Sequence, residues 1–465
     1  MTRIVRTPSQ KGARVDEALK SLLSDPVINR FGPPSSTISS LCQRWGKEVA
    51  ANPGAFSSEI RRLPYPEAAF VRIANVDTYT AYSLVDVREA SKARLFTTVS
   101  MFAGGGGSSM GYRLAGGFIP LVNEFVPEAA RTYRSNFPET RIDTRDIRDI
   151  LADKGGIEAF LRQVNLAPGE LDILDGSPPC SEFSVAGKGI RDQDIMRPYS
   201  DLQQKGIATL PFEFIELAVK ARPKVVVCEN VPALASGYPE VLGNILKELC
   251  FPDGKNGERL YYATSMVLNA EDFGVPQRRR RLFIIGVRAD VAGAIGINSD
   301  RDVLAVFPIA THSPISIRAA IAGLRQSSFD VDPWYQTAVR SRSLISAIRR
   351  LPKCPHKHTR LSHVTPGDYS KFTLTRCSWD LPAPTLVVSG QRADGMTGAI
   401  HPEKDRKFTL PELRRLFGLP DDYVLTGTLS QASERICRMV PPLLTKAIAE
   451  SIYEKVLRPY AEAMQ

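Results

Sequence analysis

The chain has 465 residues, enough for two or three domains that each bury a substantial core. Hydrophobic residues make up 43% of it and charged residues 24%, which is the balance of a soluble globular protein rather than of a fibrous or disordered one. The formal net charge of +10 favours a polyanionic partner.

Targeting and redox signals point to the cytoplasm, or to the nucleoid if the organism is prokaryotic. No apolar run approaches the roughly 20 residues of a membrane span, so we expect no membrane association. The opening stretch "MTRIVRTPSQKGARVDEALK" lacks the apolar segment of a signal peptide. The 7 cysteines are an odd number and include no C-x-x-C pair, which indicates reduced thiols rather than a disulfide framework.

Residues 1–94 form an N-terminal extension whose role the sequence leaves open. "VDEALKSLL" and "ISSLCQRWGKEVA" have short helical patterns, "FGPPSSTISS" has the composition of a linker, and "AAFVRIANV" is consistent with a strand. A small helical bundle is the favoured interpretation, and a helix-turn-helix is the alternative.

Residues 95–291 alternate between predicted strands and helices. The predicted strands include "LFTTVSMF", "IPLVNEF", "LDILDG", "KVVVCEN", "ATSMVLNA" and "RLFIIGV", and the helices between them include "PEAARTYRSNF" and "FEFIELAVKA". Strands separated by helices predict a doubly wound, mostly parallel sheet covered on both faces, that is, an α/β fold. Residues 292–389 are rich in Pro, Ser and Arg, which predicts a smaller and irregular domain, and residues 390–465 return to helical patterns.

The loop "FAGGGG", Phe102 to Gly107, ends the first predicted strand. Glycines at the carboxyl end of a strand let the backbone approach a ligand, although such a loop alone is a weak signal. Because the loop departs from G-x-G-x-x-G, a dinucleotide oxidoreductase is disfavoured. Glu124 ends the second strand, where an acid can bond ribose hydroxyls; a surface carboxylate is the alternative.

Cys180 follows two prolines just past a predicted buried strand, in "GSPPCSEF". The prolines fix φ and stiffen the segment, which suits a nucleophile that must be held near one substrate atom. A thiolate there would be favoured by a nearby helix N-terminus. The alternative of an inert buried thiol fits Cys228, inside "VVVCEN", better than Cys180.

Glu229 ends the strand that contains Cys228, so a parallel sheet brings it to the same edge as Cys180. A thiol and a carboxylate on neighbouring strand ends can act as a nucleophile and a proton donor. The run "QRRRR", residues 277–281, adds cations beside that edge or, alternatively, forms a solvated basic patch.

A group of cysteines and histidines lies in the irregular region, but its spacing matches no familiar zinc pattern. We interpret it as a polar loop and predict no metal site. Its members are Cys354, His356, His358, His363 and Cys377.

Taken in this order, the motifs over about residues 95–465 resemble those of the DNA (cytosine-5)-methyltransferases. The resemblance is carried by "FAGGGGSSMG", "NEF", "TRDI", "GSPPCSEFSVAGKG", "ENV", "FGVPQRRRRLFIIG", "LPAPTLVVSG", "RKFTLPELRRLFGLPDDY" and "VPPLLTKAIA". It implies an S-adenosylmethionine-dependent methyltransferase fold, with a target recognition domain at residues 292–389 and residues 390–465 packing back on the catalytic domain.

The resemblance also implies an S-adenosylmethionine site. Phe102 would stack near the adenine, the glycines would lie beside the methionine moiety, and Glu124 would bond the ribose. The implied cofactor-binding residues are Phe102, Ala103, Gly104, Gly106, Glu124, Phe125, Asp146, Ile147 and Pro179.

By the same resemblance, the reaction would methylate C5 of cytosine in a specific double-stranded DNA sequence, with the base flipped out of the helix. Cys180 would add to C6, Glu229 would act at N3, and Arg281 would hold O2. The implied catalytic residues are Cys180, Glu229, Arg279 and Arg281, and the implied DNA contacts are Ser184, Gln277 and Thr385. The expected partners are DNA and a companion restriction endonuclease, with the enzyme itself a monomer.

Two other functions remain open. A tRNA cytosine methyltransferase would share these motifs, but the Cys-Phe-Thr signature of that branch is absent. A catalytically silent DNA-binding regulator would not need the retained Cys180 and Glu229. The chain also departs from the family at Arg438, where a small amide is usual, and an arginine there needs a partner. The alternatives are the cofactor carboxylate, a DNA phosphate and Glu434; the positive sulfonium favours the last two.

Overall fold

The computed structural model describes residues 82–179, 197–199, 202–204, 207–254, 257–321, 324, 342–365, 373–388, 397–427 and 429–465. The chain divides into two compact units between Tyr82 and Ser83. The elements predicted within residues 1–81 therefore lie outside the described residues. Helix α6 (Leu84–Ser91) belongs to the second unit, and Ser83 begins it with a capping box in which Asp86 is the reciprocal partner.

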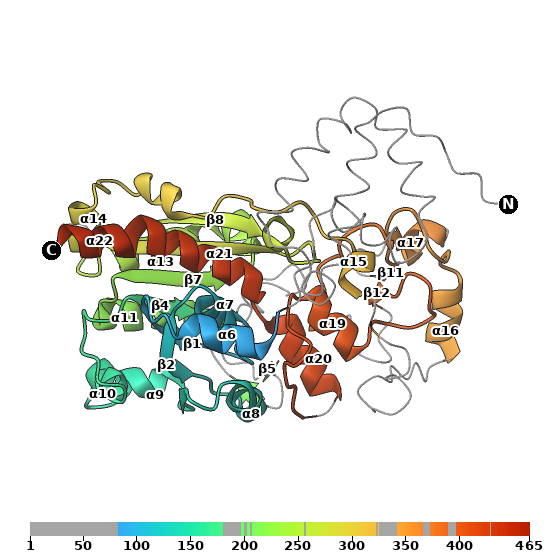
Figure 1. Cartoon of the computed structure of the whole chain (residues 1–465), viewed down its shortest axis with the longest axis horizontal. Coiled ribbons are helices and arrows are strands. Elements are labelled where there is room, and N and C mark those ends of the chain that lie inside the picture. The colour runs from blue at the N-terminus through green and yellow to red at the C-terminus, as the bar shows by residue number, and fades with distance from the viewer. Residues whose placement is uncertain are drawn as a thin grey trace, which may run out of the picture. The chain divides into compact units, whose positions relative to one another are not determined.

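The second unit is built on a seven-stranded sheet in the order β3-β2-β1-β4-β7-β9-β8 (Figure 1). Strand β9 runs antiparallel to both of its neighbours, and the other adjacent pairs are parallel. The prediction of a doubly wound, mostly parallel sheet is confirmed. The strands are β1 (Thr97–Met101), β2 (Phe118–Asn123), β3 (Arg141–Asp143), β4 (Ile173–Gly176), β7 (Val225–Asn230), β8 (Tyr261–Asn269) and β9 (Arg280–Arg288).

One face of the sheet carries an extensive apolar cluster. Val99 and Met101 of β1 and Leu174 of β4 point into it, together with Phe160 and Phe214 from the covering helices. Along β1 the apolar residues alternate with Thr98 and Ser100, whose side chains point to the other face of the sheet. The helices on this face are α9 (Ile147–Ala152), α10 (Gly156–Arg162), α11 (Leu210–Ala221) and α13 (Pro239–Cys250).

Helix α7 (Gly107–Leu114) packs against α6 and against α21 (Pro442–Ile452), which comes from the far end of the sequence (Figure 1). The contact with α21 is close because Gly111 has no side chain. A Cβ on Gly111 would lie 2.6 Å from the Cβ of Thr445 and would also overlap the carbonyl of Pro442. Helix α21 thus packs on α7, the helix that follows the glycine-rich loop.

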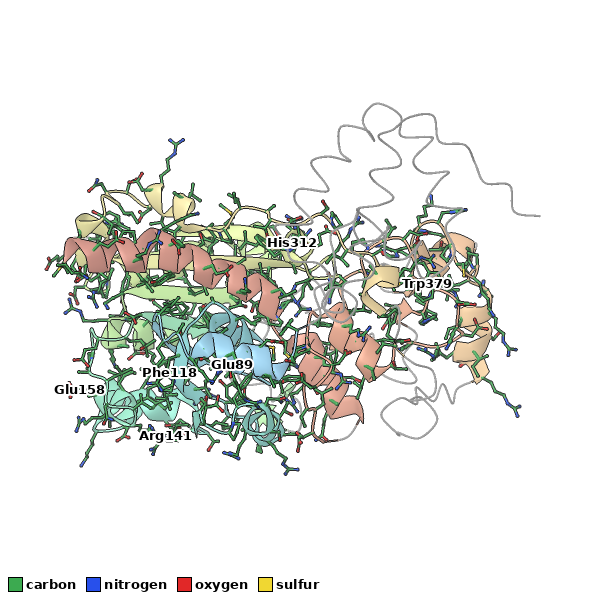
Figure 2. All side chains as sticks on the ribbon, viewed as in Figure 1. Glu89, Phe118, Arg141, Glu158, His312 and Trp379 are labelled. Carbon is green, nitrogen blue, oxygen red and sulfur yellow. The ribbon has the colours of Figure 1, made fainter. Side chains whose placement is uncertain are left out.

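A small second sheet lies in the region that follows. Its strands β10 (Thr359–Arg360), β11 (Leu374–Arg376) and β12 (Gly398–Ile400) adjoin helix α16 (Arg342–Arg349) through a separate apolar cluster. Strand β12 lies beyond residue 389, where the sequence predicted the end of this domain, yet it pairs with β11. Trp379, labelled in Figure 2, meets the ring of His401 edge-on with 5.1 Å between centroids.

Shorter elements connect these parts. They are α8 (Pro127–Asn136), β5 (Arg197–Tyr199), β6 (Leu202–Gln204), η1 (Ile207–Thr209), α12 (Ala233–Gly237), η2 (Ala270–Phe273), α14 (Ala289–Ala294), η3 (Asp302–Val306), α15 (Ile317–Ile321), α17 (Leu361–Val364), α19 (Leu410–Leu416), α20 (Leu429–Arg438), η6 (Tyr453–Leu457) and α22 (Arg458–Ala463). Within the described ranges, no helix is long and apolar enough to cross a membrane.

Candidate active site

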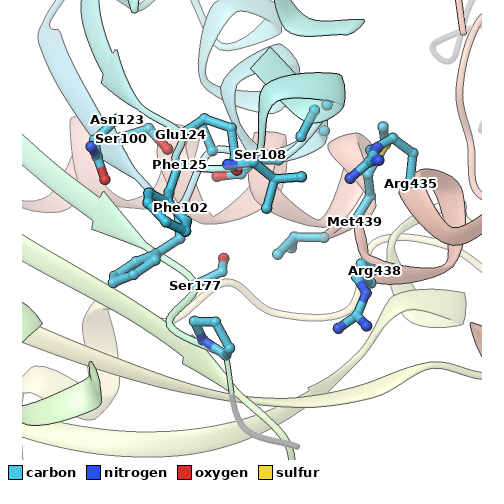
Figure 3. A pocket seen from close by; sticks show the side chains of 18 of the residues that line it. Ser100, Phe102, Ser108, Asn123, Glu124, Phe125, Ser177, Arg435, Arg438 and Met439 are labelled. Carbon is cyan, nitrogen blue, oxygen red and sulfur yellow. Dashed lines mark hydrogen bonds between the residues drawn. The ribbon is translucent and has the colours of Figure 1, made fainter. Parts of the chain in front are cut away.

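A pocket lies at the carboxyl ends of β1, β2 and β4, where the strand order reverses direction (Figure 3). This is the position at which doubly wound sheets bind ligands. The pocket contains about 900 Å³ of empty space, part of it open to solvent. Eight of the nine predicted cofactor residues line it, namely Phe102, Ala103, Gly104, Glu124, Phe125, Asp146, Ile147 and Pro179.

The loop after β1 is shaped by left-handed backbone conformations. Gly104 and Gly106 have φ of 57° and 95°, and Phe102 has φ of 55°, which is strained for a residue with a side chain. Gly106 is the ninth predicted cofactor residue. A Cβ there would lie 3.0 Å from the rings of Tyr133 and Phe137, so packing against α8 accounts for this glycine.

Glu124 is buried at the end of β2, and both of its carboxylate oxygens accept backbone hydrogen bonds. The N–H of Gly104 and the N–H of Val126 each donate at 2.6 Å. Burial raises the pKa of Glu124, while the two backbone donors and the charges of Arg435 and Arg438 act in the opposite direction. The hydrogen bond from Gly104 thus joins the glycine loop to Glu124, the residue predicted to bond the ribose.

Asp146 occupies the N-cap of α9. Its side chain accepts from the N–H of Arg148 at 2.9 Å and forms a 2.7 Å ion pair with the guanidinium of the same residue. Burial opposes ionisation, but the hydrogen bonds from Arg148 prevail and lower the pKa of Asp146. An anionic acceptor is therefore held at the pocket wall beside Ile147.

Asp175, on β4 beneath the pocket, was not identified from the sequence. Its buried carboxylate accepts hydrogen bonds from Ser100 at 2.8 Å, Ser108 at 2.5 Å and Tyr112 at 3.2 Å. Burial raises its pKa to about 6, although the three hydroxyl donors act against that rise. The signal was present in "LDILDG", where an acid stands inside an otherwise apolar strand.

The opposite wall of the pocket comes from the end of α20 and the residues after it. Arg435, Arg438, Met439 and Val440 line it, across the pocket from Phe102 (Figure 3). The Nε of Arg438 lies 2.7 Å from a carboxylate oxygen of Glu434, one helical turn earlier. Glu434 is one of the partners that the sequence left open for Arg438, and the structure shows this ion pair.

Glu229 and Arg281, two of the predicted catalytic residues, form an ion pair. The Nε of Arg281 lies 2.9 Å from a carboxylate oxygen of Glu229, at the carboxyl end of β7. Burial raises the pKa of Glu229, and the charges of Arg281 and Arg279 oppose it. Pro179, which directly precedes Cys180 in the chain and follows β4, the strand beside β7, lines the pocket. Cys180 and Ser184 lie outside the described residues.

Arg279 and Gln277 are buried and join distant segments. The guanidinium of Arg279 donates to the carbonyl of Cys437 at 2.9 Å and to that of Leu386 at 3.3 Å. The amide of Gln277 donates to the carbonyl of Leu416 at 3.2 Å and accepts from the N–H of Leu386 at 3.1 Å. These bonds join the buried Gln277 to residues 386 and 416, and its predicted contact with DNA stays a prediction.

Thr385, the other predicted DNA contact within the described ranges, is exposed. Its hydroxyl donates to the carbonyl of Arg278 at 2.6 Å. The main-chain N–H of Arg278 also donates a hydrogen bond to the carbonyl of Ala383 at 2.8 Å. Residues 383–386 therefore run alongside residues 276–279, next to the two arginines that were predicted to be catalytic.

The cysteine and histidine group has no metal-binding arrangement in the described part of the chain, where no three His, Cys, Asp or Glu side chains cluster to hold a metal ion. His358 lies between main-chain groups instead. Its Nε2 is 2.9 Å from the carbonyl of Pro382, and its Nδ1 accepts from the N–H of Ser378 at 3.0 Å.

The family model described as C-5 cytosine-specific DNA methylase matches residues 96–454. The chain belongs to this family. The assignment confirms the interpretation drawn from the order of the sequence motifs, and it makes the protein a DNA (cytosine-5)-methyltransferase by family. The matched range includes the seven-stranded sheet, the pocket and α21.

This methyltransferase is similar to bacterial Type II methyltransferases. It is 29% identical over 372 residues to the Type II methyltransferase M.Eco47II of Escherichia coli, covering 77% of this chain and 79% of the relative. It is also 29% identical to the Type II methyltransferase M1.HphI of Haemophilus parahaemolyticus, covering 77% and 86%. A solved structure of a putative DNA modification methyltransferase encoded within an E. coli prophage has the same fold, with a TM-score of 0.51 at 21% identity over 77% of this chain and 99% of that one.

Proposed function

We propose that the protein transfers a methyl group from S-adenosylmethionine to C5 of cytosine in a specific double-stranded DNA sequence, through a covalent adduct of Cys180 with C6 of a flipped-out base. The observation that carries the proposal is the ion pair between Glu229 and Arg281, both largely buried, at the carboxyl end of β7, the strand that pairs with β4. The family and the match to Type II methyltransferases support the same conclusion.

The pocket suits S-adenosylmethionine in its chemistry. Glu124 supplies a buried carboxylate for ribose hydroxyls, Asp146 an acceptor for an exocyclic amine, and Phe102 an aromatic ring for the adenine. When bound, S-adenosylmethionine supplies an electrophilic methyl group. The glycine loop keeps the wall beside it free of side chains, since a Cβ on Gly107 would lie 2.6 Å from the carbonyl oxygen of Val440.

The residues divide the reaction between them. The Cys180 thiolate forms a bond to C6 of cytosine, and the electron pair of the C5–C6 double bond becomes available at C5. Glu229 stabilises the charge that develops at N3 by donating a proton or hydrogen bond, and Arg281 holds O2. Once C5 carries the methyl group, loss of the C5 proton expels the thiolate and restores the ring. Burial raises the pKa of Glu229, which favours the protonated form that donates.

Sequence recognition is assigned to the region after the large sheet, predicted as residues 292–389, with β12 added to it by its pairing with β11. Arginine and lysine side chains there would contact phosphates and base edges of DNA. We further propose that the enzyme is paired with a restriction endonuclease, because its relatives are named Type II methyltransferases. We also propose that it acts as a monomer in the cytoplasm.

A duplex with 5-fluorocytosine at the target tests the proposal, because fluorine at C5 prevents the final elimination. The protein with S-adenosylmethionine should form a denaturant-stable adduct, and Cys180→Ala should form none while still binding DNA. Cys354→Ala, at an exposed cysteine in the small domain, is the matched control and should form the adduct. An adduct in Cys180→Ala would refute the nucleophile, and absence of one in the wild type would support a silent regulator.

Bisulfite sequencing of DNA from cells that express the protein identifies the modified base and its context. We expect 5-methylcytosine at one recurring sequence. Methylation confined to tRNA would contradict the proposal and favour the RNA-modifying branch of the family.

A further inference from the structure

Asp175 joins three elements that meet beneath the pocket. From β4, its carboxylate accepts hydrogen bonds from Ser100, near the end of β1, and from Ser108 and Tyr112 on α7. Ser100 and Ser108 also line the pocket (Figure 3), whereas Tyr112 is fully buried. One side chain therefore connects two serines of the pocket to the strand that leads to Cys180 in the chain.

The carboxylate of Asp175 is the common acceptor for the three hydroxyls. Both serine hydroxyls bond the same oxygen, Oδ2, and the hydroxyl of Tyr112 bonds Oδ1. Burial raises the pKa of Asp175 to about 6, so above neutral pH the group is mainly ionised and can accept from every donor. Without it, buried hydroxyls on β1 and α7 would lose the acceptor that holds these elements to β4.

The register of the sheet places Asp175 near the predicted catalytic acid. Asp175 pairs with Val227 of β7 in the parallel ladder. Because side chains alternate between the faces of a strand, Glu229, two positions after Val227, projects from the same face as Asp175. The charge of Glu229 adds to the effect of burial on the pKa of Asp175. The carboxylate thus lies beneath both the pocket and the end of β7.

The segment between Asp175 and Cys180 is short and stiff. It contains Pro178 and Pro179, whose rings fix φ, and Pro179 lines the pocket. A shift of the glycine loop relative to β4 would therefore also change its position relative to the segment that leads to the nucleophile. A misplacement of about 1 Å between reacting groups can lower a rate by roughly 10²-fold.

We propose that Asp175 is a positioning residue for methyl transfer: through Ser100 and Ser108 it holds the glycine loop and the start of α7 in place against the strand that leads to Cys180. This role rests on the function proposed above. It concerns the alignment of the two bound reactants and not the affinity for either of them.

Replacing the acid by an apolar side chain of similar size tests this role. At saturating DNA and S-adenosylmethionine, Asp175→Leu should lower the single-turnover methylation rate by about 10- to 100-fold. Calorimetry should show a much smaller change in the Kd of S-adenosylhomocysteine, because Asp175 lies beneath the pocket and not on its wall. Asp175→Asn keeps an oxygen that can accept from both serines, so it should retain most of the rate.

Asp172→Leu is the matched control. Asp172 stands at the amino end of the same strand, away from the pocket, and also joins β4 to β1. Its carboxylate accepts from the N–H of Thr97 at 2.8 Å and pairs with Lys224 at 2.6 Å. Asp172→Leu should lower the melting temperature and leave the methylation rate unchanged. All rates are measured below the melting temperature of every variant, so that a difference between them does not report unfolding.

Ser108→Ala is a milder variant whose result does not depend on the folding of Asp175→Leu. It removes one of the two links between Asp175 and the pocket and should lower the methylation rate by about 10-fold. The double variant should be no slower than Asp175→Leu alone, because both changes break the same link.

The outcomes separate this role from the proposed function. Wild-type rates in Asp175→Leu or in Ser108→Ala would overturn it, as would an equal loss of rate in Asp172→Leu. An increased Kd of S-adenosylhomocysteine with an unchanged rate at saturation would also overturn it, because Asp175 would then act on binding alone. In each of these cases methylation by the wild type leaves the proposed function standing. If the wild type methylates no DNA, the proposed function fails and this role fails with it.

Discussion

The Nε of Arg281 and a carboxylate oxygen of Glu229 are 2.9 Å apart, and both side chains are largely buried. The antiparallel pairing of β7 with β9 sets this distance, because it places Asn230 opposite Leu282 and Glu229 opposite Phe283. Burial raises the pKa of Glu229, and Arg281 and Arg279 limit that rise. Because burial and the two arginines act on its pKa in opposite directions, the carboxyl of Glu229 can exchange a proton with a cytosine ring nitrogen. The guanidinium of Arg281, beside it, can bind an oxygen of the same cytosine.

Replacing this carboxyl should therefore affect the chemical step most. In Glu229→Gln the shape is kept but general-acid capacity is lost, so we expect kcat to fall by roughly 10²-fold or more with little change in DNA affinity. Single-turnover methylation and a gel-shift titration measure the two quantities. Glu216→Gln, on the outer face of α11 in an ion pair with Lys220, is the control and should leave both unchanged. A higher KM with an unchanged kcat would make Glu229 a binding residue.

Arg279 should contribute to stability more than to chemistry. Arg279→Met would leave the carbonyls of Leu386 and Cys437 without their buried donor. We expect the free energy of unfolding to fall by about 2–5 kcal/mol, measured by urea denaturation.

The neighbouring Arg278 provides the comparison for that measurement. Its side chain is half exposed and pairs with Glu271, so Arg278→Met should change the free energy of unfolding by less than about 1 kcal/mol. Equal losses in the two variants would show that burial of Arg279 is not what makes it important.

The large sheet could be predicted from the sequence because its strands are apolar runs that end at glycines and acids. Phe102, Glu124 and Glu229 each stand at such an end, which is why their common location followed from strand order alone. The roles of Arg279 and Gln277 did not follow, since a basic run looks the same whether it is solvated or buried. Arg279 is buried by carbonyls 107 and 158 residues away in sequence, and no local pattern encodes those contacts.

The C-terminal boundary of the small domain also could not be predicted from the sequence. Strand β12 is only three residues long, and its pairing with β11 leaves no mark in the composition, from which the boundary at residue 389 was predicted.

Asp175 shows the opposite case. An acid within an apolar strand is a visible signal, but its three hydroxyl partners come from β1 and α7 and required the structure.

The start of α7 should tolerate no side chain at Gly107. A Cβ there would meet the main-chain oxygen of Val440 at 2.6 Å, and neither backbone can move without disturbing the pocket wall. We expect Gly107→Ala to weaken binding of S-adenosylhomocysteine and to lower the melting temperature. Gly243→Ala on α13 meets no atom within 4 Å and should stabilise the protein by about 0.5–1 kcal/mol. Unchanged ligand binding in Gly107→Ala would contradict the close packing of this loop.

Asp175 makes the stability of the catalytic domain depend on pH. Burial raises its pKa from the usual 3.8 to about 6, so between these values the folded protein holds a proton that the unfolded chain has lost. The contribution of a group with a raised pKa is fully present below the unfolded value and is lost as the pH rises through the folded value. For Asp175 the stabilising form is the protonated carboxyl, and the affected range is pH 4 to 6.

Comparison of the wild type with Asp175→Asn isolates this contribution, because other carboxyls titrate equally in both proteins. The difference in free energy of unfolding, wild type minus variant, should fall by about 3 kcal/mol as the pH rises from 4 to above 6. Urea denaturation at several pH values measures it. Asp302→Asn should show the opposite sign, since backbone hydrogen bonds from Asn298 and Ser299 and the hydroxyl of Ser299 lower the pKa of the exposed Asp302. A wild-type-minus-Asp175→Asn difference that stays constant with pH would mean that the three hydroxyl donors keep Asp175 ionised throughout, and its carboxylate would then be a fixed anchor for α7 rather than a titrating group.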